Sequence, residues 1–241
     1  GLERQLSDEV TAGLAIAHAN TSISFRDRLG SGTLNVLRVG PYASFFRDDW
    51  FADAAISYGY HDNSVRRNVA VGSIAETAEG RYHANDVSLY FGLGRLWGTP
   101  DRVLSPVASI QYIYFDQPGF VESNAPAAGL TLGNNSADSL RSRVGLESTR
   151  WASWRCFQVR GDWSAGWAHE YLADDALAAQ FTGGTTTFRT QRLAGYRDSA
   201  YVTAGLALNR GSRLSLFSRY TGELSNDGSF HAIDLGLTAA Y

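Results

Sequence analysis

The chain has 241 residues, a formal net charge of −3 and a pI near 6.0, so its charge does not favour nucleic-acid binding. No apolar run approaches the roughly 18 residues of a spanning helix, which excludes a helical membrane protein but not a barrel, whose strands alternate their faces. A single cysteine, Cys156, excludes an internal disulfide and a cysteine-based metal site. All 21 cationic side chains are Arg. Methionine is absent and the chain begins at Gly1, so we expect a mature or trimmed piece.

Apolar residues recur with period two along the whole chain, which is the spacing of strands with one apolar face. The 25 Gly and only 5 Pro favour long strands with close backbone approach. No segment has a convincing helical period. In chain order, ten strands are predicted: Val10–Phe25, Leu34–Phe46, Trp50–His61, Asp86–Trp97, Val103–Phe115, Leu140–Ser148, Phe157–Glu170, Ser199–Asn209, Arg213–Leu224 and His231–Tyr241.

The connections between these strands alternate in length. Short turns such as RDD and GTPD alternate with longer polar segments, among them Asp62–Asn85, Gln117–Asp138 and Tyr171–Asp198. We expect TTTFRTQRL, within the last of these, to extend as a hairpin above the membrane. This alternation is typical of an antiparallel up-and-down transmembrane β-barrel with short periplasmic turns and long extracellular loops. Aromatic residues near the short turns would form the periplasmic girdle: Phe45, Phe46, Trp50, Trp97, Trp151 and Trp154.

A soluble β-sandwich or lipocalin-like barrel is the alternative fold. Its second face should be solvated and rich in Lys, Glu and Thr. Here the second face carries Gly, Ser, Ala, Tyr and charges of both signs, which suits the lumen of a membrane barrel. The charged residues predicted on that face are Arg38, Asp53, Arg141, Arg143, Glu147, Arg160, Asp162, Arg213, Arg219, Glu223 and Asp234. They are either a structural ion network or a polar lining for a passing polypeptide; the pattern leaves both open.

Several stretches resemble the C-terminal translocator domain of autotransporters, the type V secretion family. They are WFADAAISYGYHDNSVRR, ADSLRSRVGLES, GWAHEYLADD with AQFTGG, LSLFSRYTGELSND and HAIDLGLTAAY, and they follow the family's order over nearly the whole chain. The resemblance implies a barrel domain over residues 1–241 in the bacterial outer membrane. It implies protein transport: the barrel anchors an N-terminal passenger, assists its export and is inserted by the barrel-assembly machinery.

The family barrel typically has about twelve strands, preceded by a helix threaded through the pore. Ten strands and no preceding helix are predicted here, and GLERQLSDE reads as the tail of a preceding strand and its turn. Either two strands and the helix are missing, or the barrel closes at ten.

The terminal strand also resembles the C-terminal signal by which outer-membrane barrels are recognised for insertion. Its pattern consists of Asp234, Gly236, Ala239 and the terminal aromatic Tyr241. A terminal aromatic ring would lie at the periplasmic interface, and a tail would obscure the edge by which the strand is read.

Two other functions are weighed against export. A small porin-like channel is one, although a ten-stranded barrel gives a narrow interior. A hydrolase with a site at the outer rim is the other, because His61 and Asp62, His83 and Asp86, and His169, Glu170, Asp174 and Asp175 lie near strand ends. No G-x-S-x-G or H-E-x-x-H motif accompanies them, so we predict no enzyme, catalytic residue, metal or cofactor.

Overall fold

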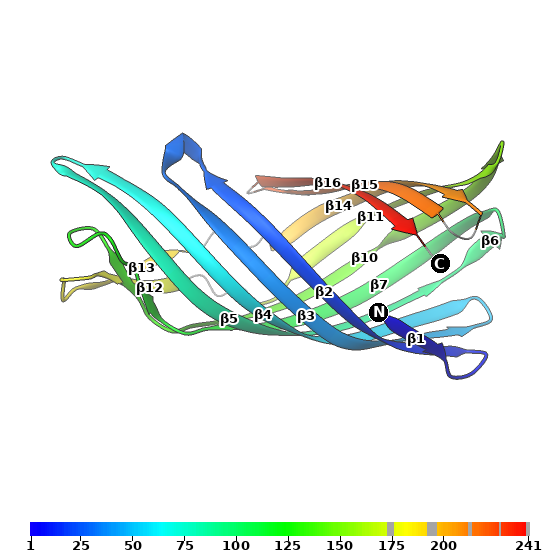
Figure 1. Ribbon diagram of the computed structural model, residues 1–241. Coiled ribbons are helices and arrows are strands. Elements are labelled where there is room, and N and C mark those ends of the chain that lie inside the picture. Colours follow the sequence, from blue (N-terminus) through cyan, green and yellow to red (C-terminus); the bar gives the residue numbers. More distant parts are fainter. Residues whose placement is uncertain (173–175, 192–196, 212–213, 227, 240–241) are drawn as a thin grey trace.

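The computed structural model describes residues 1–172, 176–191, 197–211, 214–226 and 228–239, almost all of which lie in β-strands (Figure 1). Apart from the three-residue 3-10 turn η1 (Arg26–Arg28), no helix occurs among them. Among the described residues, no helix is long and apolar enough to cross a membrane. The strands are β1 (Leu2–Gln5), β2 (Val10–Phe25), β3 (Gly30–Arg47), β4 (Trp50–Val71), β5 (Ile74–Arg95), β6 (Trp97–Thr99), β7 (Arg102–Gln117), β8 (Phe120–Val121), β9 (Leu130–Leu132), β10 (Asn135–Trp154), β11 (Phe157–Glu170), β12 (Ala176–Phe181), β13 (Thr187–Gln191), β14 (Asp198–Arg210), β15 (Leu214–Ser225) and β16 (Gly228–Ala239).

The main sheet is an antiparallel meander that curves into an open barrel wall (Figure 1). Its strands follow the order β1-β2-β3-β4-β5-β7-β10-β11-β14-β15-β16, and β6 pairs with β7 at the margin. Within the described residues, β1 and β16 form its two edges and do not pair with each other. All ten predicted strands are present in their described parts, and β1 confirms that the first residues belong to a preceding strand. The predicted up-and-down β-barrel architecture is thereby confirmed.

The predicted loop over Asp62–Asn85 is wrong, because β4 and β5, each 22 residues long, continue through it to a tight turn at Gly72 and Ser73. A spanning strand needs only about 9–11 residues, so this hairpin projects well beyond the apolar band. There the ladder is supported by polar cross-strand pairs such as Arg66 with Glu79, which replace the apolar pattern. This is why hydrophobic periodicity did not reveal these strand ends.

The other two long connections form a separate four-stranded sheet in the order β13-β12-β9-β8. The hairpin predicted around TTTFRTQRL exists in its described part, since β13 pairs with β12; residues 192–196 lie outside the described residues. The small sheet is joined to the tip of β5 by a bridge between Glu79 and Ser123 and by Tyr82 stacked on Phe120 at 4.5 Å. The far ends of β4 and β5 and this sheet lie at the end of the molecule opposite the short turns (Figure 1).

The two faces of the main sheet differ as a membrane barrel requires. Among the described residues, the buried hydrophobic side chains are all alanines, and no large side chain is fully buried. Large apolar residues stand outward instead, for example Ile56 at 54% exposure and Leu235 at 78%. A soluble sheet would bury these side chains in a core, so the exposed apolar face is the lipid-facing surface.

We therefore predict different costs for a carboxylate at two adjacent positions of β7. Ile110 is exposed on the outward face, whereas Gln111 lies on the other face opposite Arg141. Ile110→Glu should lower the free energy of unfolding by about 2 kcal/mol, because it places a charge against lipid, and Gln111→Glu by less than about 1 kcal/mol. Urea unfolding of the protein in lipid vesicles, followed by tryptophan fluorescence, measures both; equal losses would contradict this assignment of faces.

Candidate functional site

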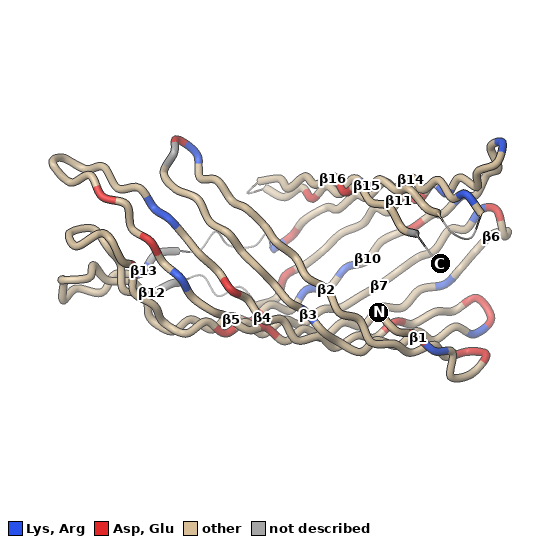
Figure 2. Tube along the Cα trace, in the orientation of Figure 1, with Lys and Arg blue, Asp and Glu red and all other residues tan. Residues whose placement is uncertain are grey.

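The charged residues predicted for the lumen lie on one face, the concave face of the main sheet. Directly paired residues of neighbouring strands share a face, and the register joins Ser44 to Asp53, Arg143 to Ser109, and Arg219 to Asp234. The same rule places Arg38, Arg141, Glu147, Arg160, Asp162 and Glu223 there. Arg213 lies outside the described residues. Acidic and basic residues are interspersed along the sheet rather than separated (Figure 2).

A first cluster joins β3, β4 and β5 around the buried carboxylate of Asp86, which is 4% exposed. Arg38 donates to Asp86 at 2.7 Å and to Ser57 at 2.8 Å, and His61 Nε2 lies 2.6 Å from the same Asp86 oxygen. The Arg38 side chain reaches Asp86 across β4, over Gly59. A Cβ atom at Gly59 would lie 2.5 Å from Asp86 Oδ1 and 3.1 Å from Arg38 Nη2, so the bridge depends on this glycine.

A second cluster joins β10, β11, β14 and β15. Arg141 pairs with Glu223 across the two intervening strands, and Ser199 donates to Glu223 at 2.7 Å. Asp162 lies 3.4 Å from Arg160 and 3.9 Å from Arg219. Because this network crosses strands that are not neighbours, it connects the concave face more widely than the backbone ladder alone.

Arginine side chains also lie over aromatic rings on this face. The guanidinium of Arg143 is 5.4 Å from the ring centre of Tyr201, and that of Arg160 is 5.7 Å from the ring centre of Trp151. Trp151 pairs directly with Arg160 on this face, so the prediction that it belongs to the outward periplasmic girdle is wrong. Tyr201 itself lies over Gly145 and Gly166, whose missing side chains leave room for its hydroxyl. Such cation–π contacts hold the arginines without using up all their hydrogen-bond donors.

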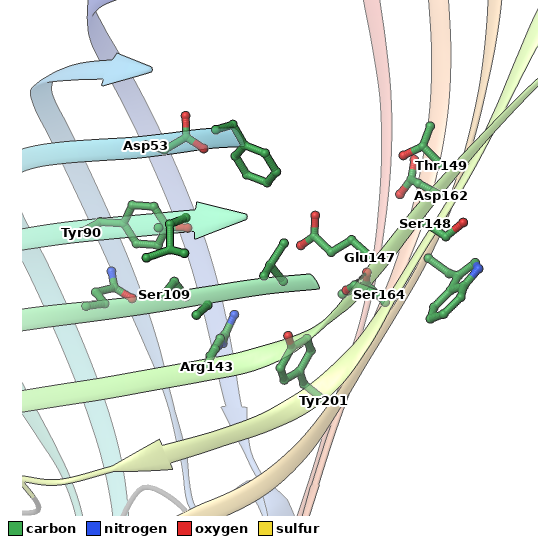
Figure 3. A pocket seen from close by; sticks show the side chains of 18 of the residues that line it. Asp53, Tyr90, Ser109, Arg143, Glu147, Ser148, Thr149, Asp162, Ser164 and Tyr201 are labelled. Atoms are coloured by element: carbon green, nitrogen blue, oxygen red, sulfur yellow. Dashed lines mark hydrogen bonds between the residues drawn. The ribbon is translucent and has the colours of Figure 1, made fainter. Parts of the chain in front are cut away.

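Between these walls lies a cavity of about 350 Å³ (Figure 3). Figure 3 shows Asp53 on one side, Glu147 and Asp162 on the other, and Arg143 and Tyr201 between them. Arg141 and Arg219 complete its charged lining. The lining offers positive and negative charges as well as hydrogen-bond donors and acceptors. These groups suit the amides and varied side chains of a polypeptide better than a purely apolar ligand.

The rim residues weighed for a hydrolase do not assemble into one site. His83 faces outward, 3.5 Å from Asp62 and stacked on Tyr60, whereas Asp86 faces the lumen and contacts His61. His83 and Asp86 therefore lie on opposite faces of β5 and do not form a shared site.

On β11, His169 lies 2.8 Å from Asp198 on the outward face. The adjacent Glu170 accepts from the backbone N–H of Leu140 at 2.9 Å. Asp174 and Asp175 lie outside the described residues. Among the described residues, no three His, Cys, Asp or Glu side chains lie close enough to hold a metal ion.

Sequence reasoning missed Asp86 as a lumen residue and assigned it to the rim. The signal was present, because Asp86 alternates in phase with Ser88 and Tyr90, which it placed on the polar face. On the terminal strand, Asp234 and Gly236 lie on the concave face, with Gly236 directly under the ring of Phe217. Ala239 ends β16, and Tyr241 lies outside the described residues.

An outward apolar band, a charged concave face and an up-and-down meander define an outer-membrane β-barrel. The autotransporter beta-domain family model matches residues 1–221, so the chain belongs to the autotransporter beta-domain family, which confirms the resemblance. It is an outer-membrane translocator barrel of the type V secretion class.

Known relatives agree with this assignment. An extracellular serine protease of Serratia marcescens is 24% identical over 99% of this chain, but the match covers only 23% of the relative's length. The translocator domain of the autotransporter NalP from Neisseria meningitidis has the same fold, with a TM-score of 0.75, 17% identity, and coverage of 99% of this chain and 78% of NalP. The beta domain of the Bordetella autotransporter BrkA has a TM-score of 0.59 at 18% identity, over 95% of this chain and 79% of BrkA.

The Gly59 bridge gives a direct test of the first cluster. Gly59→Val should lower the free energy of unfolding by about 1–3 kcal/mol, because the added side chain overpacks the site and separates the buried Asp86 from Arg38. Gly161→Val is the matched control, since a Cβ there meets no atom within 4 Å. Urea unfolding in vesicles measures both variants, and an equal effect would show that Gly59 has no special role.

Proposed function

We propose that this barrel anchors an N-terminal passenger in the outer membrane and assists its export to the cell surface, with the passenger passing along the charged concave face. The observation that carries the proposal is the mixed-sign cavity between Asp53, Arg143 and Glu147. Its groups hydrogen-bond any polypeptide without matching one sequence. The chain spans only about a quarter (23%) of the length of the curated relative described above. The passenger itself is therefore something we propose and not something that these residues contain.

In this proposal the lumen charges have both of the roles left open by the sequence: a structural ion network and a polar lining for a passing polypeptide. The two ion clusters rigidify the wall, and the residues that line the cavity, which include members of the second cluster, contact the polypeptide. The barrel performs no catalysis, and a protease activity such as the Serratia relative's name describes would belong to a passenger. No cofactor is required by this mechanism.

We also propose that residues 1–241 form the main part of the barrel and that segments outside them join its edges. Support comes from β1 and β16, which are edges without a further partner strand in the part of the sheet that the structure describes, because unpaired backbone groups are costly in lipid. The match to 78% of the NalP translocator chain, which leaves a further part of that domain unmatched, agrees with this. Such a segment would hydrogen-bond to β16 along residues 228–239.

Site-directed crosslinking tests the export path. Glu147 faces the cavity and the adjacent Leu146 faces lipid at 44% exposure. In a Cys156→Ser background, Glu147→Cys should crosslink to a passenger stalled during export, and Leu146→Cys should not. Electrophoresis of the full-length protein after crosslinking reads out the adduct. Equal crosslinking at both positions, or none at Glu147→Cys, would refute passage along the concave face.

A small channel is the second candidate, and the same cavity motivates it. Conductance in planar bilayers separates the two functions. A translocator whose lumen is filled by polypeptide should show low, flickering conductance, whereas a channel should show a steady open level. Removal of the passenger should raise the conductance of a translocator and leave that of a channel unchanged.

Insertion by the barrel-assembly machinery is a further part of the proposal, with Asp234, Gly236, Ala239 and Tyr241 as the signal it reads. Tyr241→Ala, or a polar extension after Tyr241, should lower the amount of inserted barrel several-fold. The same extension placed at the extracellular turn of Gly72 and Ser73 is the control, because that turn lies far from the terminal strand. The fraction that resists unfolding in cold detergent measures insertion; unchanged insertion in both variants would show that the terminal residues are not a signal.

A further inference from the structure

The outward face of β3, β4 and β5 changes its chemistry in regular steps toward the extracellular end. Register rows across the three strands run from Val39, Tyr58 and Val87 to Leu37, Tyr60 and Asn85, then to Asn35, Asp62 and His83, then to Thr33, Ser64 and Arg81, and end at Ser31, Arg66 and Glu79. An apolar band is thus followed by an aromatic and polar belt, and then by hydroxyls and arginines. This is the order of environments that a lipid molecule presents from acyl chain to headgroup.

The belt is defined by specific contacts. Tyr60 stacks on His83 with ring centres 5.5 Å apart, and its hydroxyl lies 2.9 Å from His83 Nδ1. One row lower, Tyr58 donates to Asn85 at 2.5 Å. Amphipathic rings whose polar atoms are bonded in this way mark the membrane–water interface on the outward face.

Directly beyond the belt lies a hollow of about 230 Å³. The hydroxyls of Ser31, Thr33 and Ser64 line it together with Arg66, Glu79 and Arg81. Arg81 lies two residues from His83 along β5, which is about 7 Å beyond the belt at the rise of an antiparallel strand. The hollow therefore lies at the height of lipid headgroups rather than at the height of acyl chains.

Among the described residues of this region one arginine, Arg81, has no carboxylate partner. Arg66 donates to Glu79 through Nε at 3.0 Å and through Nη2, which satisfies that carboxylate. Asp62 lies 3.5 Å from His83. Arg81 makes no hydrogen bond or ion pair with any residue of the described part of the chain and is exposed. A guanidinium next to hydroxyl donors, with no carboxylate of its own, matches a phosphate group.

We propose that this hollow binds the phosphate of an anionic lipid in the outer leaflet, with Arg81 as its main ligand and Thr33 and Ser64 as hydroxyl donors. The acyl chains of the same lipid would lie over the exposed side chains of Leu37, Tyr58 and Val87. The geometry makes the extended β4–β5 hairpin a lipid contact as well as a surface projection. The proposal does not depend on passenger export, since the hollow lies on the face opposite the lumen.

Native mass spectrometry of the detergent-purified full-length protein tests this, with phosphorylated lipid A and chemically dephosphorylated lipid A as the two probes. The wild type should retain the phosphorylated probe more strongly. Arg81→Gln should reduce that retention by roughly tenfold, as the loss of one charge-assisted contact implies. Ser64→Ala should cause a smaller loss.

Arg189→Gln is the matched control, because Arg189 is an exposed arginine on β13 at the same end of the molecule but away from this face. It should retain lipid like the wild type. Arg81→Lys keeps the charge, and it should recover part of the retention lost in Arg81→Gln if phosphate is bound.

Three outcomes would overturn the proposal. They are equal retention of the two lipid probes, equal losses in Arg81→Gln and Arg189→Gln, and displacement of the lipid by millimolar inorganic phosphate alone. The last would identify a free-phosphate site instead of a lipid site.

Discussion

The hydrogen-bonded ladder between neighbouring strands is the constraint on which the rest of this structure depends. In lipid every backbone N–H and C=O group needs a partner within the protein, and an antiparallel meander provides one for each strand except those at the edges. The ladder fixes register, and register fixes which side chains share a face. The apolar outward band and the charged concave face are both consequences of that single alternation.

Much of this architecture could be predicted from the sequence because lipid enforces the period. The bounds predicted for Val10–Phe25 and Phe157–Glu170 agree with β2 and β11 to the residue. The tips of β4 and β5 escaped prediction because water, unlike lipid, does not require an apolar face. There the strands are stabilised by polar pairs that have no periodic signature.

The candidate site was predictable in part, for the same reason. Parity along each strand is a local property, so the sequence placed Arg38, Arg141 and Glu223 on one face. Their partners depend on geometry between strands. Arg38 reaches Asp86 over the intervening Gly59, and Arg141 reaches Glu223 over two strands. No spacing along the chain encodes such contacts, because they follow from the curvature of the finished sheet.

The contact between Arg141 and Glu223 has a consequence for the size of the barrel. From β10 to β15 the sheet crosses three strand spacings, about 14 Å, and register aligns Glu223 with Gly145, four residues along β10 from Arg141, so the arc between the two charges is longer still. The two side chains meet by spanning this arc in a straight line between their backbone positions. Because the length of that line is limited, the radius of the curved sheet between the two positions is limited as well. The length of an arginine and a glutamate therefore restrains how flat the wall becomes. The ion pair between Arg141 and Glu223 therefore limits the radius of curvature of the sheet. That radius in turn determines how many strands a closed barrel needs.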